Sequence, residues 1–100
     1  MQLYADIGTA WFTDDKESVS RLLPKLKAHF SDANVFYAPV AVFIAGFCFY
    51  LGEREEGFEW LERSYSRKEF GLLSIKSDPL YDRIRTDLRY IDLVKRLGLG

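Results

Sequence analysis

The sequence of 100 residues predicts an all-α fold built from antiparallel helical hairpins. Apolar residues recur at helical spacings along most of the chain, and no stretch alternates apolar and polar residues long enough to predict a strand. Glycine or aspartate follows the apolar runs where helices are expected to end. The length predicts one domain, and 48% hydrophobic residues supply ample material for a core.

A helix over residues 2–12 opens the chain, and Thr13, Asp14 and Asp15 break it. Any of these three polar residues can cap the next helix. Glu17 lies three residues after Asp14, a spacing that resembles a capping box. The apolar residues of this first helix have spacings of four, three and one: Leu3, Ile7, Ala10 and Trp11.

The second helix is amphipathic and ends before a polar turn at residues 31–34. Pro24 removes a backbone donor from it and should bend it near Ser20. Its apolar face has spacings of three, one, three and four: Val19, Leu22, Leu23, Leu26 and Phe30.

Residues 35–51 are the most apolar run, with no charged residue. The run reaches only the lower length limit of a membrane span and contains Pro39 and Gly46, so we interpret it as the central buried helix. Gly46 is small enough for a neighbouring helix to approach closely. Gly52 should end this helix, and a charged amphipathic helix over residues 53–67 completes a second hairpin.

The C-terminal part predicts shorter elements. Asp78 and Pro79 are a capping residue and a first-turn proline, which begin a short helix that ends near Arg85. Before it, a short helix or turn within residues 68–77 should bury its apolar residues: Phe70, Leu72, Leu73 and Ile75. The last helix starts at residues 86–87, ends at Gly98 and has an apolar side: Leu88, Ile91, Val94 and Leu97.

The predicted helix ends recur at a regular interval. Asp14, Gly52 and Thr86 lie 38 and 34 residues apart, which is the period range of tetratricopeptide hairpins. Positions five, nine and twelve after each end should form the core of the second helix of each hairpin. In the first two units these are Val19, Leu23 and Leu26, then Gly57, Leu61 and Ser64. Lys95 at the second of these positions makes the third unit depart from the pattern.

The sequence resembles the tetratricopeptide-repeat (TPR) family. Residues 51–61 are its most typical part. Residues 78–90 and 97–99 are similar to the C-terminal ends of TPR regions found behind other domains in regulatory proteins of bacteria and archaea. Gly57 in place of the usual alanine, and Cys48 in place of the usual aromatic residue, depart from the family pattern.

The resemblance implies a short α-solenoid with a C-terminal capping helix pair. Its units would cover about residues 2–31, 35–67 and 73–98 of one domain spanning residues 1–100. A chain that begins almost inside a helix is expected to be a fragment of a longer protein.

In TPR arrays the first helix of each pair lines a concave face, and the resemblance places two groups of residues there. Aromatic anchors separated by small residues suit a groove for a peptide or a helix. The alternative is that they pack inside the domain or against a missing neighbour. The positions are Tyr4, Gly8, Trp11, Phe12, Val42, Gly46, Phe49 and Tyr50. Lysine and asparagine, which bind acidic chaperone tails in this family, are absent from these positions.

Few residues indicate catalytic or cofactor chemistry. His29 is the only histidine, so no zinc site is indicated. Cys48, the only cysteine, lies in the most apolar helix, which favours a buried and inert thiol. The glutamates of residues 53–62 are interpreted as a solvated helix face with Arg54 and Arg63 as partners. We therefore predict no catalytic residue, no cofactor and no metal.

The charge pattern argues against nucleic-acid or membrane partners. The net charge is −1, and the basic cluster near the C-terminus alternates with aspartates, so we expect a cap held by salt bridges. Its basic residues are Arg83, Arg85, Arg89, Lys95 and Arg96, and its acidic ones Asp82, Asp87 and Asp92. No signal-peptide pattern begins the chain, and a single cysteine makes no internal disulfide, so a cytoplasmic location is expected.

These observations predict a non-catalytic scaffold for protein–protein or domain–domain contacts. One alternative is a homodimer formed through the N-terminal face, where Tyr4, Trp11 and Phe12 lie. The other is a small helical enzyme or small-molecule-binding domain that uses the carboxylates or Cys48.

Overall fold

The structure, a computed structural model, describes residues 2–28 and 41–99. Within these ranges every regular element is a helix, which confirms the all-α prediction. The elements are α1 (Gln2–Phe12), α2 (Lys16–Ala28), α3 (Ala41–Tyr50), α4 (Arg54–Arg67), the 3₁₀ helices η1 (Phe70–Ser74) and η2 (Pro79–Ile84), and α5 (Leu88–Arg96).

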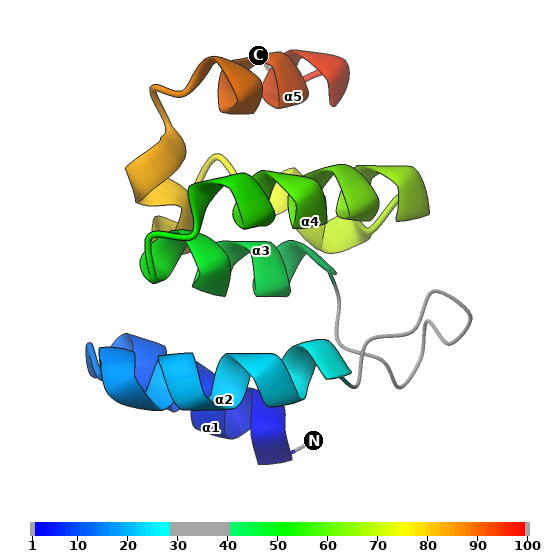
Figure 1. Cartoon of the computed structure of the whole chain (residues 1–100). Helices are drawn as coiled ribbons and strands as arrows, with labels where there is room; N and C mark the ends of the chain where they lie inside the picture. The colour runs from blue at the N-terminus through cyan, green and yellow to red at the C-terminus, as the bar shows by residue number, and fades with distance from the viewer. Residues whose placement is uncertain (1, 29–40, 100) are drawn as a thin grey trace.

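The helices are stacked in the order of the chain (Figure 1). α1 and α2 form one hairpin, and α2 packs on α3, which forms the next hairpin with α4. η2 packs beside α3, and α5 lies over α4 at the far end of the stack. The two ends of the chain therefore lie at opposite ends of the molecule.

Four helices end at a residue with a positive φ angle: Asp14 (57°), Gly52 (84°), Lys68 (57°) and Gly98 (77°). At Gly52 the amide donates to the Phe49 carbonyl at 3.0 Å and the next amide donates to the Cys48 carbonyl at 2.8 Å. This pattern satisfies the free carbonyls of a helix end. The ends predicted at Asp14, Gly52 and Gly98 are confirmed. The predicted end of the fourth helix at Arg67 is confirmed as well, although the positive φ angle of the next residue, Lys68, was not expected because lysine rarely adopts this conformation.

The predicted capping box between Asp14 and Glu17 is wrong. Asp15 caps α2, because its carboxylate accepts the Ser18 amide at 3.1 Å and the Ser18 hydroxyl at 2.7 Å. The carboxylate of Asp14 accepts the hydroxyl of Tyr50 instead. This residue therefore joins the turn of the first hairpin to the turn of the second.

α2 continues through Pro24 to Ala28 as one helix. The proline ring is exposed, and four of the five predicted apolar residues of this helix are buried. Phe30 lies outside the described residues, as do residues 35–40 of the predicted central helix. The described part of that helix is α3.

The core is centred on α3, which is buried along its length except at Phe43. This confirms the prediction of a central helix. The neighbour that approaches Gly46 closely is η2, since a Cβ atom at this glycine would lie 2.2 Å from Cδ2 of Leu80. The hydroxyl of Tyr81, also on η2, donates to the Val42 carbonyl at 2.7 Å. η2 therefore packs closely against α3 at Gly46 and Val42.

The predicted burial of residues 70–75 is half right. Leu72 and Ile75 are buried, while Phe70 and Leu73 are exposed. The segment forms a single short 3₁₀ helix, and a helix of three residues per turn presents only one narrow face to the core.

The predicted inner face of α5 is wrong at Leu88 and Ile91, which are exposed. The buried residues of this helix are Tyr90, Leu93 and Val94. Tyr90 is held inward by a hydrogen bond, since the Arg85 guanidinium donates to its hydroxyl at 3.0 Å.

The carboxylate of Glu69 joins α3 to the end of α4. Its oxygens accept the first two amides of α3, those of Ala41 and Val42, both at 3.0 Å. They also accept the Ser64 hydroxyl and the Arg67 Nε, both at 2.8 Å. The side chain is only 7% exposed. A helix start has free amides and a partial positive charge, so this anion fixes where α3 begins.

The close packing of α4 on α3 predicts that alanine is too large at Gly57. A Cβ atom there would lie 2.4 Å from Cε1 of Phe49, a buried ring in edge contact with Phe58 at 4.9 Å. We expect Gly57→Ala to lower the free energy of unfolding by about 1–3 kcal/mol, measured by urea denaturation.

The matched control is Gly8→Ala in α1, where a Cβ atom meets no described atom within 4 Å. It should raise the free energy of unfolding by up to about 1 kcal/mol, because alanine favours a helix more than glycine does. Equal stability of the two variants would contradict the packing described here.

Candidate functional site

The structure places the residues predicted for the aromatic groove in different surroundings. Val42, Phe49 and Tyr50 are buried in the core. Trp11 packs partly against the same core, and Phe12 is exposed at the end of α1. Tyr4 lies on α1, and its side chain is outside the described part of the chain. For the three α3 residues, internal packing is the arrangement that the structure shows, because η2 and α4 cover α3.

Tyr50 has a connecting role. Its hydroxyl donates to Asp14, and its carbonyl accepts Nη1 of Arg83 at 3.2 Å. Lys16 and Arg83 lie 5.6 and 5.4 Å from the centre of its ring. Burial, with the hydrogen bond to Asp14, raises the pKa of Tyr50 to about 12. These contacts tie together α2, α3 and η2.

The candidates for chemistry have ordinary structural surroundings. Cys48 is buried, and burial raises the pKa of its thiol to about 12, so the reactive thiolate does not form near neutral pH. His29 lies outside the described residues. Among residues 2–28 and 41–99, no group of three or more metal-binding side chains is positioned to hold an ion.

Three glutamates of α4 form ion pairs with other helices. Glu55 and Glu62 bond Arg89 and Arg96 of α5 at 2.9 and 2.7 Å. Glu56 bonds Lys27 of α2. Arg54, one of the predicted partners, bonds Asp87 just before α5. These ion pairs connect neighbouring layers of the stack.

The predicted salt-bridged cap is present near the C-terminus. Arg85 bonds Asp82 at 2.9 Å, and Arg96 bonds Asp92 at the same distance. A third pair joins Arg89 to Asp87 at 3.1 Å. The arginines therefore have local anionic partners, as their alternation with aspartates predicts.

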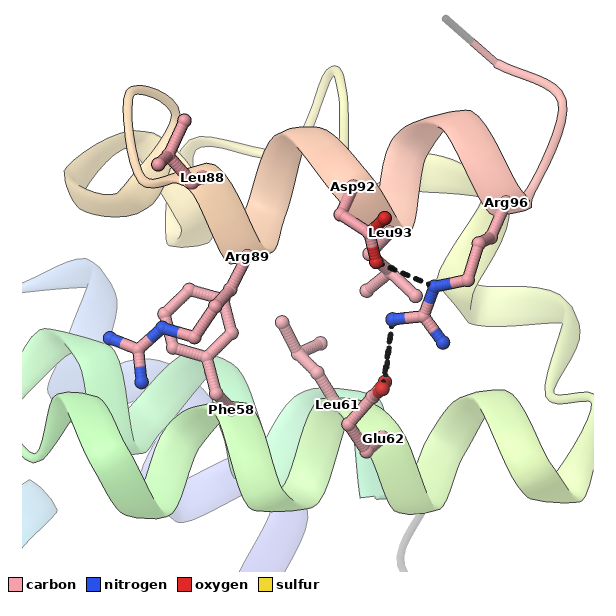
Figure 2. Close-up of a pocket in the computed structure, with 8 residues that line it drawn as sticks. All are labelled: Phe58, Leu61, Glu62, Leu88, Arg89, Asp92, Leu93 and Arg96. Carbon is pink, nitrogen blue, oxygen red and sulfur yellow. Dashed lines mark hydrogen bonds and ion pairs between the residues drawn. The ribbon is translucent and has the colours of Figure 1, made fainter.

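An apolar pocket that sequence reasoning missed lies between α4 and α5 (Figure 2). Its volume is about 350 Å³. Leu61 and Leu93, which are 0% and 1% exposed, form its buried floor, and Leu88 lies at its mouth with 81% of its surface exposed. The lining residues are Phe58, Leu61, Glu62, Leu88, Arg89, Asp92, Leu93 and Arg96. We call this pocket the α4–α5 groove. The sequence pattern predicts Leu88 to lie on the inner face of α5, whereas the structure exposes it at this pocket.

One end of the α4–α5 groove is closed by Arg89. Its guanidinium lies 4.1 Å from the centre of the Phe58 ring and bonds Asp87 and Glu55. Asp87 also bonds Arg54 and caps α5 through the Arg89 amide at 2.8 Å. The hydrogen bonds from Arg89, assisted by Arg54, lower the pKa of Asp87 to about 2. The carboxylate is therefore charged throughout the physiological pH range.

The other end is closed by Arg96. Its guanidinium bridges Glu62 on α4, at 2.7 Å, and Asp92 on α5, at 2.9 Å (Figure 2). It also lies 4.7 Å from the centre of the Tyr65 ring. Both ends of the α4–α5 groove are thus formed by an arginine laid over an aromatic ring, a contact that combines cation–π attraction with apolar packing.

A second apolar pocket lies near the C-terminal end of α4, with a volume of about 320 Å³. The exposed side chains of Phe70 and Leu73 are part of its wall. The complete lining is Tyr65, Lys68, Glu69, Phe70, Leu72, Leu73 and Leu97.

No protein-family model, no curated protein and no solved structure matches this chain. The TPR resemblance therefore stays a prediction from the residues quoted above. In the part of the chain that the structure describes, no helix has both the length and the apolar character needed to cross a membrane.

The burial of Cys48 predicts slow labelling by a thiol reagent such as DTNB. The native protein should react at least about 100-fold more slowly than the protein in denaturant, because the core must open first. The control is the double variant Cys48→Ser, Phe12→Cys, which places the thiol at an exposed position and should react rapidly. Rapid labelling of native Cys48 would favour the enzymatic alternative.

Proposed function

We propose that this chain is a non-catalytic protein-interaction module, a short TPR-like stack of helical hairpins that binds its partner in the α4–α5 groove. The observation that carries the proposal is an apolar pocket of about 350 Å³ with an exposed leucine, Leu88, at its mouth. Pockets of a few hundred Å³ receive bulky side chains, and apolar side chains gathered at a surface mark interaction sites.

The walls of the α4–α5 groove are held in place before any partner arrives. α4 packs on α3, and Glu69 fixes the start of α3 to the end of α4. α5 is joined to α4 by the pairs Arg89–Glu55 and Arg96–Glu62. A preformed site loses little conformational entropy when it binds, so more of the contact energy appears as affinity.

Burial at the repeat positions supports the hairpin-stack part of the proposal. Positions five, nine and twelve after the first two helix ends are buried: Val19, Leu23, Leu26, Gly57, Leu61 and Ser64. In the third unit Lys95 is exposed, as expected where the pattern departs, but Ile91, which fits the pattern, is exposed as well.

The proposal includes a cytoplasmic setting and a larger regulatory protein as the parent. A single buried thiol suits a reducing compartment. A second candidate function, homodimerisation through the N-terminal face, is favoured by the exposed ring of Phe12.

Selection of displayed random peptides tests the proposed docking surface. Peptides would be selected on the wild-type protein and then measured against Leu88→Glu. We expect the selected peptides to bind the variant at least about 10-fold more weakly, because a charge at the mouth opposes an apolar anchor. Leu88 is exposed, so circular dichroism and the unfolding free energy should not change.

The matched control is Leu73→Glu, a second exposed leucine, which lines the other pocket. If the selected peptides bind Leu73→Glu more weakly but bind Leu88→Glu as well as the wild type, the docking surface is the second pocket instead. Peptides that tolerate both substitutions would contradict the proposal. Sedimentation would detect self-association of the protein. If Phe12→Glu abolishes self-association and Leu88→Glu leaves it intact, the homodimer is supported instead.

A further inference from the structure

The mouth of the α4–α5 groove presents carboxylates more than arginines. The side chains of Glu55, Asp92 and Glu62 are 84%, 67% and 52% exposed. Those of Arg89 and Arg96 are 42% and 35% exposed. An approaching ligand therefore meets carboxylate oxygens at both ends of the groove.

The two arginines of the groove are drawn inward by neighbouring aromatic rings. Arg89 lies over Phe58 and Arg96 over Tyr65, at 4.1 and 4.7 Å. Each guanidinium also bonds two carboxylates. Their charge is neutralised by neighbouring side chains, and their stems add apolar wall to the groove.

The local charge around the groove is negative. Four carboxylates and three guanidinium groups surround it, which leaves one negative charge in excess. The carboxylates are those of Glu55, Glu62, Asp87 and Asp92, and the guanidinium groups are those of Arg54, Arg89 and Arg96. The adjoining face of α4 adds Glu53, Glu56 and Glu59, with Lys27 and Arg63 as the nearby cations.

We infer that the partner is a helical segment with one bulky apolar anchor flanked on both sides by lysine or arginine. This inference rests on the proposed function. The anchor would lie beside Leu88, over the buried floor that Leu61 and Leu93 form. Charge complementarity selects the flanks, since basic side chains pair with the exposed carboxylates while acidic ones are repelled.

The spacing of the carboxylates sets the spacing of the flanks. Glu55 and Glu62 are seven residues apart on α4, which corresponds to roughly 10 Å along the helix. A partner helix that lies along α4 reaches both with basic residues about one turn before and one turn after its anchor. This defines a pattern of Lys, anchor and Lys at positions i−4, i and i+3.

Three synthetic helical peptides test the inference. They share a central leucine anchor and differ only in the two flanking positions, which carry lysine, glutamine or glutamate. Affinity would be measured by fluorescence anisotropy and location by amide NMR shifts of Leu88 and Leu93. We expect the lysine peptide to bind about fivefold more tightly than the glutamine peptide, with the glutamate peptide weakest. The preference should shrink as salt concentration rises.

A charge variant separates attraction at the groove from nonspecific attraction. The double variant Glu62→Gln, Asp92→Asn keeps oxygen acceptors for Arg96 and removes two negative charges. It should lose the preference for lysine flanks while still binding the glutamine peptide. The control Glu17→Gln, an exposed carboxylate on α2, should keep the preference.

The outcomes distinguish the two proposals. Equal binding of all three peptides, abolished by Leu88→Glu, would overturn the charge inference and leave the docking proposal standing. Tightest binding of the glutamate peptide would also overturn the inference. If no peptide shifts the amides of Leu88 and Leu93, both proposals fail.

Discussion

The central hairpin of the stack is held together by one buried anion, the carboxylate of Glu69. It accepts the first two amides of α3 together with Ser64 and Arg67 from the last turn of α4. A buried charge is strongly destabilising when its partners are removed, so this cluster specifies a single arrangement of the central hairpin. Because the start of α3 is fixed to the end of α4, the opposite face of α4 is presented to α5 in one orientation.

The α4–α5 groove follows from how α5 meets that face. Tyr90, Leu93 and Val94 are the buried residues of α5, and the ends of the contact are closed by long arginine side chains. Arginine stems pack less completely than aliphatic core residues, so an apolar space remains between the two helices. The same arginines neutralise the inner charges and leave carboxylates outermost. The shape of the groove and its charge thus have one structural origin.

The sequence predicted the features that depend on local chemistry. Gly52 and Gly98 end helices because glycine adopts a positive φ angle easily, and α3 is central because it is apolar on every side. The sequence did not predict which face of α5 is buried. A face with Leu88 and Ile91 and a face with Tyr90 and Leu93 both have helical spacing. In the structure the face with Tyr90 and Leu93 is buried, and the Tyr90 hydroxyl accepts a hydrogen bond from Arg85. The candidate groove was missed for the same reason, and no local pattern identifies Glu69 as the cap of a helix that begins 28 residues earlier.

Nuclear Overhauser effects measure directly whether a partner occupies the α4–α5 groove beside Leu88. Leucine methyl groups of the protein would be isotope-labelled, and contacts would be recorded to an unlabelled peptide obtained by selection. We expect cross-peaks from the peptide to the methyl groups of Leu88 and of the neighbouring Leu61 and Leu93. Cross-peaks confined to Leu73 and Leu97, in the second pocket, would contradict this expectation.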